Sequence, residues 1–280
     1  MSGRIVVGID GSASAAAALA WAASEARLRG AELVACSVVE RRPGHDDASD
    51  SSATLALEES AGGYPTTLVT RHGEPGVELL AACDDADLLV VGSRGRGRLA
   101  GSLLGSVSRA CVRHARCPVV VVGHRSATVP GGRVVAGVDG SPPCACGAPR
   151  RRTRSPVAGR DPPGVARRPL GHHRDRVDHA NAGAALGVGH KLVADELATT
   201  GVDGEPAVVA GHPDEVLVQH SGDADLLVLG TRGHNPAASL LLGSVSEHCV
   251  RYARCPVLVT RADRQHRDDQ AQASSSEPPT

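Results

Sequence analysis

The chain has 280 residues, which predicts two domains of about 100–150 residues each. Hydrophobic residues make up 41 %, enough for packed cores, but with no Phe, one Trp and two Tyr the chain has almost no side chains for stacking on nucleic-acid bases. A formal net charge of −1, and the lack of any apolar run near the roughly 20 residues of a membrane span, argue against nucleic acid and membranes as partners.

The N-terminal stretch leads directly into a short apolar strand over 5–9, with no basic region and apolar run of a signal peptide. We therefore expect a cytoplasmic protein. Six of the eight cysteines stand singly in apolar or helical contexts, which predicts reduced, buried thiols. The remaining two, Cys144 and Cys146, form a lone C-x-C, which is weak evidence for a metal site.

The first half continues as an alternation of helices and strands. An Ala-rich helix over 12–30 closes at Gly30 and is followed by a strand over 31–39. The next predicted elements are a helix over 54–60, a strand over 66–70, a helix over 74–85 opened by Glu74 and Pro75, a strand over 87–92, a helix over 106–115 and a strand over 117–122. Apolar strands separated by helices predict an α/β fold with a parallel sheet covered on both faces. Such sheets bind ligands outside the carboxyl ends of their strands.

Three stretches of the first half return in the second. RIVVGIDGS (4–12) matches RVVAGVDGS (133–141), and DADLLVVGSRG (85–95) matches DADLLVLGTRG (223–233). The third pair is LLGSVSRACVRHARCPVVVV (103–122) and LLGSVSEHCVRYARCPVLVT (241–260). The chain is therefore a tandem duplication.

The repeats set the expected domain boundaries. The first domain covers 1–124, a linker covers 125–132, and the second domain covers 133–261. Residues 262–280 are polar, lack periodicity and are expected to be a disordered tail.

The second copy loses the pattern over 142–190. Seven prolines fall within 142–169, and each interior proline costs a helix about 3 kcal/mol. The first helix and second strand of this copy therefore cannot form as they do in the first. Two explanations stay open: the stretch is out of frame relative to an ancestral gene, or it is a disordered basic insert that binds an acidic partner.

A glycine-rich loop, VVGSRGRGRLAGSLLGSVS (90–108), follows the strand over 87–92. Gly92 and Gly95 remove Cβ atoms where a bulky anion would press on the backbone, and Gly105 and Ser106 open a helix whose N–H groups favour phosphate. The spacing is repeated in the second copy by Gly230, Gly233, Gly243 and Ser244. A flexible surface loop with a helix cap is the alternative. The only lysine, Lys191, lies far from both loops, which excludes a P-loop.

The pattern G-x2-G-x9-G-[ST], with Asp10 after the first strand, resembles the ATP-binding branch of the universal stress protein family in its tandem-domain form. The resemblance covers 3–123, 132–141 and about 191–261. It implies two tandem doubly wound, five-stranded parallel-sheet domains of the Rossmann-like, adenine nucleotide alpha hydrolase-like kind. The second domain would have a degenerate region from its first strand to its second.

The resemblance also implies roles for single residues. Ile9 and Asp10 would border the adenosine, with Asp10 reaching a Mg²⁺ ion on the phosphates, and Val38 would line the adenine pocket. The loop residues would hold ribose and triphosphate: Gly92, Gly95, Gly105, Ser106 and Val107. A second, weaker site would use Asp139, Gly230, Gly233, Gly243, Ser244 and Val245, because no counterpart of Val38 can be located.

The expected function is that of an ATP-binding regulator of the stress response, with protein partners unidentified. The alternatives are an adaptor whose loops are vestigial, or a slow ATPase. No catalytic group stands out, and the S-G-G-x-D-S and H-x-G-H motifs of related nucleotide enzymes are missing after the first strand, so we expect at most weak hydrolysis of ATP.

The last strands, 117–122 and 255–260, are expected to pair within one chain. Whether the molecule also forms a homodimer stays open.

Overall fold

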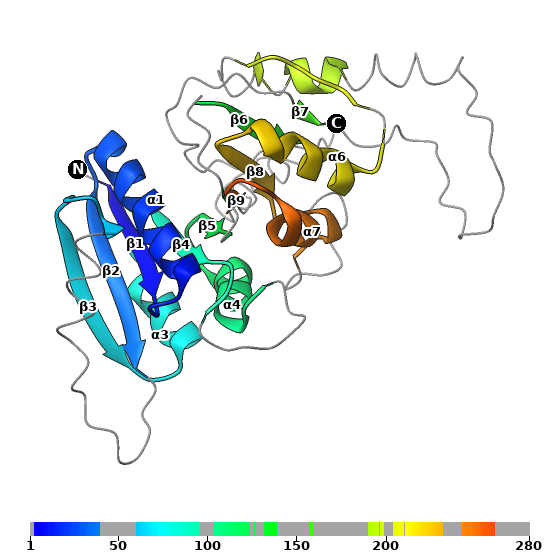
Figure 1. Ribbon diagram of the computed structural model, residues 1–280. Coiled ribbons are helices and arrows are strands. Elements are labelled where there is room, and N and C mark those ends of the chain that lie inside the picture. Colours follow the sequence, from blue (N-terminus) through cyan, green and yellow to red (C-terminus); the bar gives the residue numbers. More distant parts are fainter. Residues whose placement is uncertain are drawn as a thin grey trace, which may run out of the picture.

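The computed structural model describes residues 3–39, 60–95, 104–123, 126, 132–138, 157–158, 190–195, 197–198, 204–209, 211–231 and 242–260. Within these ranges, nine strands form one sheet in the order β3-β2-β1-β4-β5-β9-β8-β6-β7 (Figure 1). The strands of each half run parallel to one another. The α/β architecture with a mainly parallel sheet, expected from the alternation of apolar strands and helices, is confirmed.

The first half follows the predicted order of elements closely. Its elements are β1 (Arg4–Ile9), α1 (Ala13–Arg29), β2 (Glu32–Val39), β3 (Thr66–His72), α3 (Pro75–Ala82), β4 (Leu88–Gly92), α4 (Ser106–His114) and β5 (Val119–Val122). The helix predicted over 54–60 lies outside the described residues except for Ser60, which is helical.

Gly30 at the end of α1 and Glu74 with Pro75 at the start of α3 lie as predicted, and Ser12 caps the start of α1. The Ser12 hydroxyl accepts a hydrogen bond from the Ala15 N–H (3.2 Å), and Gly30 ends α1 in the left-handed region at φ 63°. At α3, the Glu74 carboxylate accepts hydrogen bonds from the next free main-chain N–H groups, one of them that of Val77 (2.8 Å), while Pro75 occupies the first turn. At the start of each helix, a side-chain oxygen therefore accepts hydrogen bonds from main-chain N–H groups that have no partner within the helix.

Within the described residues, the second half repeats this arrangement with fewer elements. It contains β6 (Val134–Gly137), β7 (Val157–Ala158), α6 (Pro213–His220), the 3-10 turn η1 (Ser221–Asp223), β8 (Leu226–Gly230), α7 (Ser244–Tyr252) and β9 (Val257–Thr260). Residues 190–195 are also helical. None of the helices in the described ranges is both long and apolar enough to cross a membrane.

A short strand occupies the place of β2 in the second half. β7 pairs in parallel with β6, with Ala136 opposite Val157 and Gly137 opposite Ala158. It has two residues against the eight of β2. The expectation that no second strand like that of the first half forms stays a prediction, because the residues on both sides of β7 lie outside the described part of the chain; β7 itself pairs at the expected position. The residues that would form the first helix of this copy lie outside the described part of the chain, as do most of 142–190 and the tail over 262–280.

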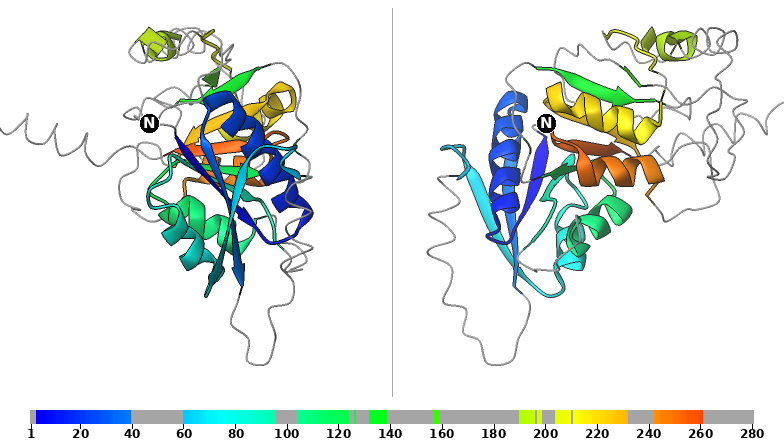
Figure 2. Two further views of the ribbon diagram at one scale, coloured as in Figure 1. Left: turned by 90° about the vertical axis from the view of Figure 1, so that its left-hand side faces the viewer. Right: turned by 45° about the vertical axis from the view of Figure 1, so that its right-hand side comes forward.

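The two halves join through their last strands. β5 and β9 pair antiparallel, with Val120 opposite Leu258, Val119 opposite Val259 and Val121 opposite Val257. This confirms the expected pairing of 117–122 with 255–260. The sheet is therefore continuous through the molecule, as the two views in Figure 2 show.

Each face of the sheet has its own core. On one face, α3, α4, α6 and α7 contribute to a single buried cluster that includes Leu79, Cys111, Leu217 and Cys249 and spans both halves. On the other face, α1 packs its alanines and Leu19 onto the strands. The first half is thus covered on both sides, which keeps its strand ends in fixed positions.

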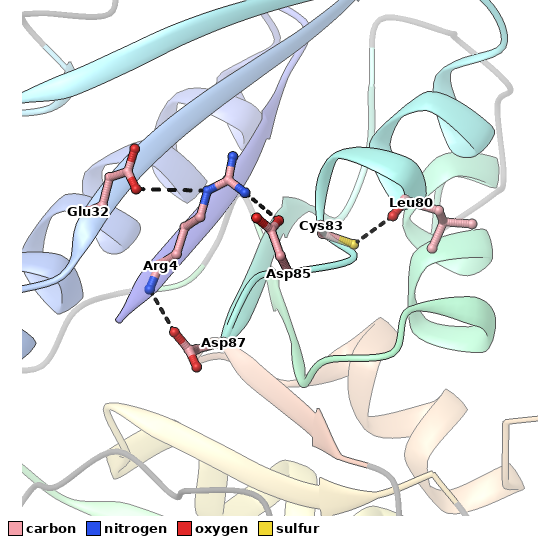
Figure 3. Close-up of polar contacts among 6 residues, drawn as sticks. All are labelled: Arg4, Glu32, Leu80, Cys83, Asp85 and Asp87. Carbon is pink, nitrogen blue, oxygen red and sulfur yellow. Dashed lines mark hydrogen bonds and ion pairs between the residues drawn. The ribbon is translucent and has the colours of Figure 1, made fainter. Parts of the chain in front are cut away.

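The amino ends of the strands are held by a repeated contact. The Arg4 N–H donates to the Asp87 carboxylate (2.7 Å), and the Arg133 N–H donates to Asp225 in the same way (2.8 Å). The Arg4 guanidinium also pairs with Asp85 and, at 3.9 Å, with Glu32 (Figure 3). This edge lies opposite to the edge where the glycine loops begin.

Candidate functional site

The candidate site lies at the carboxyl ends of β1, β2 and β4. β1 stands between β2 and β4: the chain first runs from β1 through β2 to β3 on one side, and then crosses to β4 and β5 on the other side. This is the switch point where doubly wound sheets place their ligands. Asp10 follows β1 directly, Val38 is the second-last residue of β2, and Gly92 is the last residue of β4. The structure therefore brings these three predicted residues to one edge.

The two ends of the glycine loop are hydrogen-bonded to each other just after the carboxyl end of β4. The Ser93 N–H donates to the Val122 carbonyl (2.8 Å), and the Gly105 N–H donates back to the Ser93 carbonyl (2.8 Å). The Ser108 hydroxyl donates to the Gly92 carbonyl (2.6 Å), which fixes α4 to the end of β4. The N–H of Gly105 is thus used within the loop, so any ligand contact from this helix start must come from the N–H groups after it.

The second half builds the same closure. The Thr231 N–H donates to the Thr260 carbonyl (2.7 Å), and the Gly243 N–H donates to the Thr231 carbonyl (2.8 Å). The Ser246 hydroxyl donates to the Gly230 carbonyl (2.6 Å). The repeated spacing in the sequence therefore corresponds to a repeated geometry.

The loop passes directly over Asp10. A Cβ placed on Gly95 would lie 2.5 Å from Asp10 Oδ2, closer than any real Cβ contact. Asp10 is exposed, and its other oxygen accepts a hydrogen bond from the Ser12 N–H (3.0 Å). The φ of Gly95 is not positive, so a side chain at this position would meet the movable Asp10 carboxylate and no backbone strain.

The main chain of α1 leaves no room for a side chain at Gly92. A Cβ at this position would lie 2.7 Å from the Ser14 carbonyl carbon and 2.9 Å from the Ala15 nitrogen, both in the first turn of α1. The glycine therefore allows α1 to approach the end of β4. The sequence suggested room for an anion as the reason for this residue, whereas the structure supplies a packing reason. A contact between Gly92 and a ligand stays a prediction.

Two serines that the sequence analysis did not single out tie the loop to α1. The Ser12 hydroxyl donates to the Arg94 carbonyl (3.2 Å), and the Ser14 hydroxyl, which is buried, donates to the same oxygen. The signal in the sequence is the S-x-S after Asp10, which was interpreted only as the start of a helix. These contacts set the path of the loop between Ser93 and Gly95.

The start of α4 differs from the starts of α1 and α3 in its capping. Within the described residues, no side chain bonds to the main chain at its N-cap, Gly105, whereas Ser12 and Glu74 cap α1 and α3. Ser106 is exposed and Val107 is half-buried at this end. The partial positive charge of the helix N-terminus is thus directed toward the loop, where it favours an anion.

The apolar residues expected around a ligand divide between the two faces of the sheet. Val38 and Val107 pack against the cluster on the α3 and α4 face. Ile9 packs on the α1 face. The structure thus brings Val38 and Val107 to one side of the site, and Ile9 borders it from the other.

The second predicted site is described only in part. Gly230 ends β8, and Gly243, Ser244 and Val245 form the start of α7, where the described residues again include no side-chain cap. Asp139 and Gly233 lie outside the described residues. In place of β2 with its Val38, this half has the two-residue β7.

Comparisons with known proteins agree on one family. The sequence profile described as the Universal stress protein family matches residues 1–123 and 154–261, so the second match includes β7. The curated universal stress protein Rv2623 of Mycobacterium tuberculosis is 31% identical over 301 residues, covering 92% of this chain and 96% of that protein. Universal stress protein Rv2005c of the same organism is 30% identical over 294 residues, with the same coverage of 92% and 96%. The crystal structure of a universal stress protein from Archaeoglobus fulgidus has the same fold, with a TM-score of 0.61 at 18% identity over 94% of this chain and 97% of that one.

Proposed function

Because this chain belongs to the universal stress protein family, we propose that it binds ATP with Mg²⁺ at the carboxyl edge of its first half and acts as a nucleotide-dependent regulator of the stress response. The observation that carries the proposal is the approach of the bare Gly95 main chain to the Asp10 carboxylate. A glycine, a carboxylate and a helix start for which the described residues provide no side-chain cap lie at the switch point of the sheet.

The triphosphate is proposed to lie against the start of α4. The N–H groups of Ser106 and Val107 follow Gly105, whose own N–H bonds to Ser93. Main-chain N–H groups and the helix dipole bind phosphate without a lysine, which suits a chain whose only lysine is Lys191. Gly92 and Gly95 would then lie along the ribose and phosphates.

Asp10 is the proposed protein ligand of the ion. Carboxylate oxygens suit Mg²⁺, which in nucleotide sites is held by one or two carboxylates together with substrate phosphates. The ion, when bound, neutralises phosphate charge beside the carboxylate. The adenine is proposed to lie against Val38, which is half-buried at the end of β2.

A single strong site per chain is proposed. The second half keeps the closed loop base at Gly230 and Gly243, but in the described residues the strand that would provide its adenine wall is the two-residue β7. Titration of the full chain with ATP and Mg²⁺ by calorimetry is expected to show one site that saturates below about 1 mM. A titration without saturation in that range would mean that the loops are structural and would favour the adaptor function.

The role of Asp10 has its own test. Asp10→Asn is expected to weaken binding of ATP in the presence of Mg²⁺ by about tenfold, corresponding to about 1.4 kcal/mol, because the amide lacks the charge that the ion requires. The affinity measured in EDTA is not expected to fall, because without the ion the substitution only removes a negative charge beside the phosphates.

Asp84→Asn is the matched control, since Asp84 is exposed and pairs only distantly with Arg116 (3.8 Å) at the opposite edge of the sheet. Affinity for ATP with Mg²⁺ should be unchanged in this variant. Equal losses with and without Mg²⁺ in Asp10→Asn would contradict the assignment of Asp10 to the ion.

A further inference from the structure

Two cysteines of the first half lie side by side at the amino edge of the sheet. Cys83 ends α3, and its Sγ donates to the Leu80 carbonyl at 3.2 Å (Figure 3). Cys117 lies two residues before β5 and is half-buried, whereas Cys83 is 1 % exposed. The two thiols lie within hydrogen-bonding reach of each other. Neighbouring thiols are the first requirement for a disulfide.

The second half repeats the position with one sulfur replaced. The internal repeats align Cys83 with Ser221 and Cys117 with Cys255. The Ser221 hydroxyl donates to the Val218 carbonyl (2.6 Å), as Cys83 does to Leu80. It also accepts from the N–H of Arg254 (2.9 Å), the residue directly before Cys255. The geometry that joins the two turns is therefore a property of the fold, and only the first half places a cysteine on each side.

Cys83 also differs from the other described cysteines in its electrostatic surroundings. The hydrogen bond from the Cys117 thiol lowers the pKa of Cys83 below its ordinary value. Burial instead raises the pKa of Cys111, Cys249 and Cys255, each to about 12. Since the thiolate is the reactive form, the lowered pKa favours Cys83 as the attacking thiol of the pair, and the half-buried Cys117 is the more accessible of the two.

We propose that Cys83 and Cys117 form an oxidation site, at which a peroxide converts the two thiols into an intramolecular disulfide. The Cys83 thiolate attacks a peroxide oxygen, the O–O bond breaks, and the departing hydroxide takes a proton to become water. The resulting sulfenic acid is attacked by Cys117, whose sulfur displaces hydroxide, and this hydroxide leaves as water with the Cys117 proton. Overall, two thiols are oxidised and one peroxide is reduced to two waters.

The disulfide would connect the turn between α3 and β4 to the turn between α4 and β5. Both turns lie at the amino ends of the strands, away from Asp10 and the glycine loop at the carboxyl ends. The proposal is therefore independent of the proposed function, and oxidation is expected to leave the affinity for ATP unchanged.

Tryptic mapping of the full chain tests the proposal directly. Reduced protein is treated with hydrogen peroxide, the remaining thiols are alkylated, and the digest is analysed by mass spectrometry without reduction. Cleavage at arginine places Cys83 in peptide 72–94, Cys111 in 110–113 and Cys117 in 117–125, so each thiol is read separately. We expect a linked species of 72–94 and 117–125 that disappears on treatment with dithiothreitol. Recovery of both peptides as alkylated monomers after oxidation would overturn the proposal, as would a link from Cys83 to any other cysteine.

Two single substitutions separate the role of Cys83, which attacks the peroxide, from that of Cys117, which attacks the sulfenic acid. Cys117→Ser is expected to remove the link and to leave Cys83 as a sulfenic acid that a 1,3-diketone reagent traps, whereas Cys83→Ser removes both products. Cys83→Ser should fold, because Ser221 occupies the equivalent position with the same contact to a carbonyl.

A substitution in the second half tests whether a second disulfide can be created at the equivalent position. Ser221→Cys places a cysteine next to Cys255, and the same treatment is expected to yield a second link, between peptides 192–232 and 255–261. Absence of this second link would contradict the equivalence of the two positions on which the proposal rests.

Discussion

Gly95→Asp is expected to lower the affinity of the full chain for ATP by at least about 100-fold, or about 2.7 kcal/mol. A Cβ at this position would lie 2.5 Å from Asp10 Oδ2. Asp10 is exposed and its carboxylate ends a flexible side chain, so the fold can adjust, but the new side chain fills the space above Asp10. It also adds a second negative charge where the phosphates are proposed to bind.

Stability should be nearly unchanged in this variant. The φ of Gly95 is not positive, so aspartate meets no backbone strain, and we expect the free energy of unfolding to stay within about 1 kcal/mol of the wild type. Calorimetric titration with ATP and urea unfolding measure the two quantities separately. A variant that unfolds like the wild type and binds ATP with the same affinity would place the nucleotide elsewhere.

Gly222→Asp is the matched control for Gly95→Asp. The nearest atom to a Cβ at Gly222 belongs to Arg254, at 3.7 Å, an ordinary contact. The first half has Asp84 at the position equivalent to Gly222, so the substitution is compatible with the fold. Both affinity and stability should match those of the wild type.

Gly92→Ala is expected to destabilise the fold by about 3 kcal/mol. The added methyl group would lie 2.7 Å from the Ser14 carbonyl carbon and 2.9 Å from the Ala15 nitrogen. These are main-chain atoms of the first turn of α1, which packs its buried alanines on the sheet and cannot withdraw without opening that core. Urea unfolding should therefore show a lower midpoint.

Gly222→Ala provides the comparison, with an expected change within about 0.5 kcal/mol, because its Cβ meets nothing closer than 3.7 Å. Equal stabilities of Gly92→Ala and Gly222→Ala would show that α1 shifts freely at this point. Gly92 would then owe its place to something other than the packing of α1.

The elements of the first half could be predicted because each depends on local patterns. The strand over 88–92 is a continuous apolar run, Gly30 ends α1 in the left-handed region, and Glu74 with Pro75 begins α3. The edge that carries the candidate site followed from the same patterns, because carboxyl ends of parallel strands meet at one edge.

The contacts that shape the site could not be predicted, because they depend on the approach of segments distant in sequence. Ser12 and Ser14 donate to the Arg94 carbonyl, about eighty positions away, and neither residue type signals that partner. The same applies to Gly92, whose neighbour is α1. Along the chain, Gly105 looks like a donor to phosphate, but its N–H is already bonded to Ser93.

β7 is an example of a strand that the sequence pattern does not predict. Prolines and arginines surround Val157–Ala158, and no periodicity marks a strand. The two residues nevertheless pair with Ala136 and Gly137, because β6 offers an exposed row of main-chain groups next to them.

The antiparallel contact between Val119–Val122 and Val257–Thr260 has a consequence for how the halves evolve and assemble. Because both partners are tethered in one polypeptide, dilution cannot separate them in the way it separates a dimer of single units, and their ratio is always one to one. The C-terminal half can therefore lose its capacity for ligand and still be retained, since it permanently shields the strand edge of its neighbour. Selection would then remove mutations in the middle of this half only where they weaken the pairing of β9 with β5.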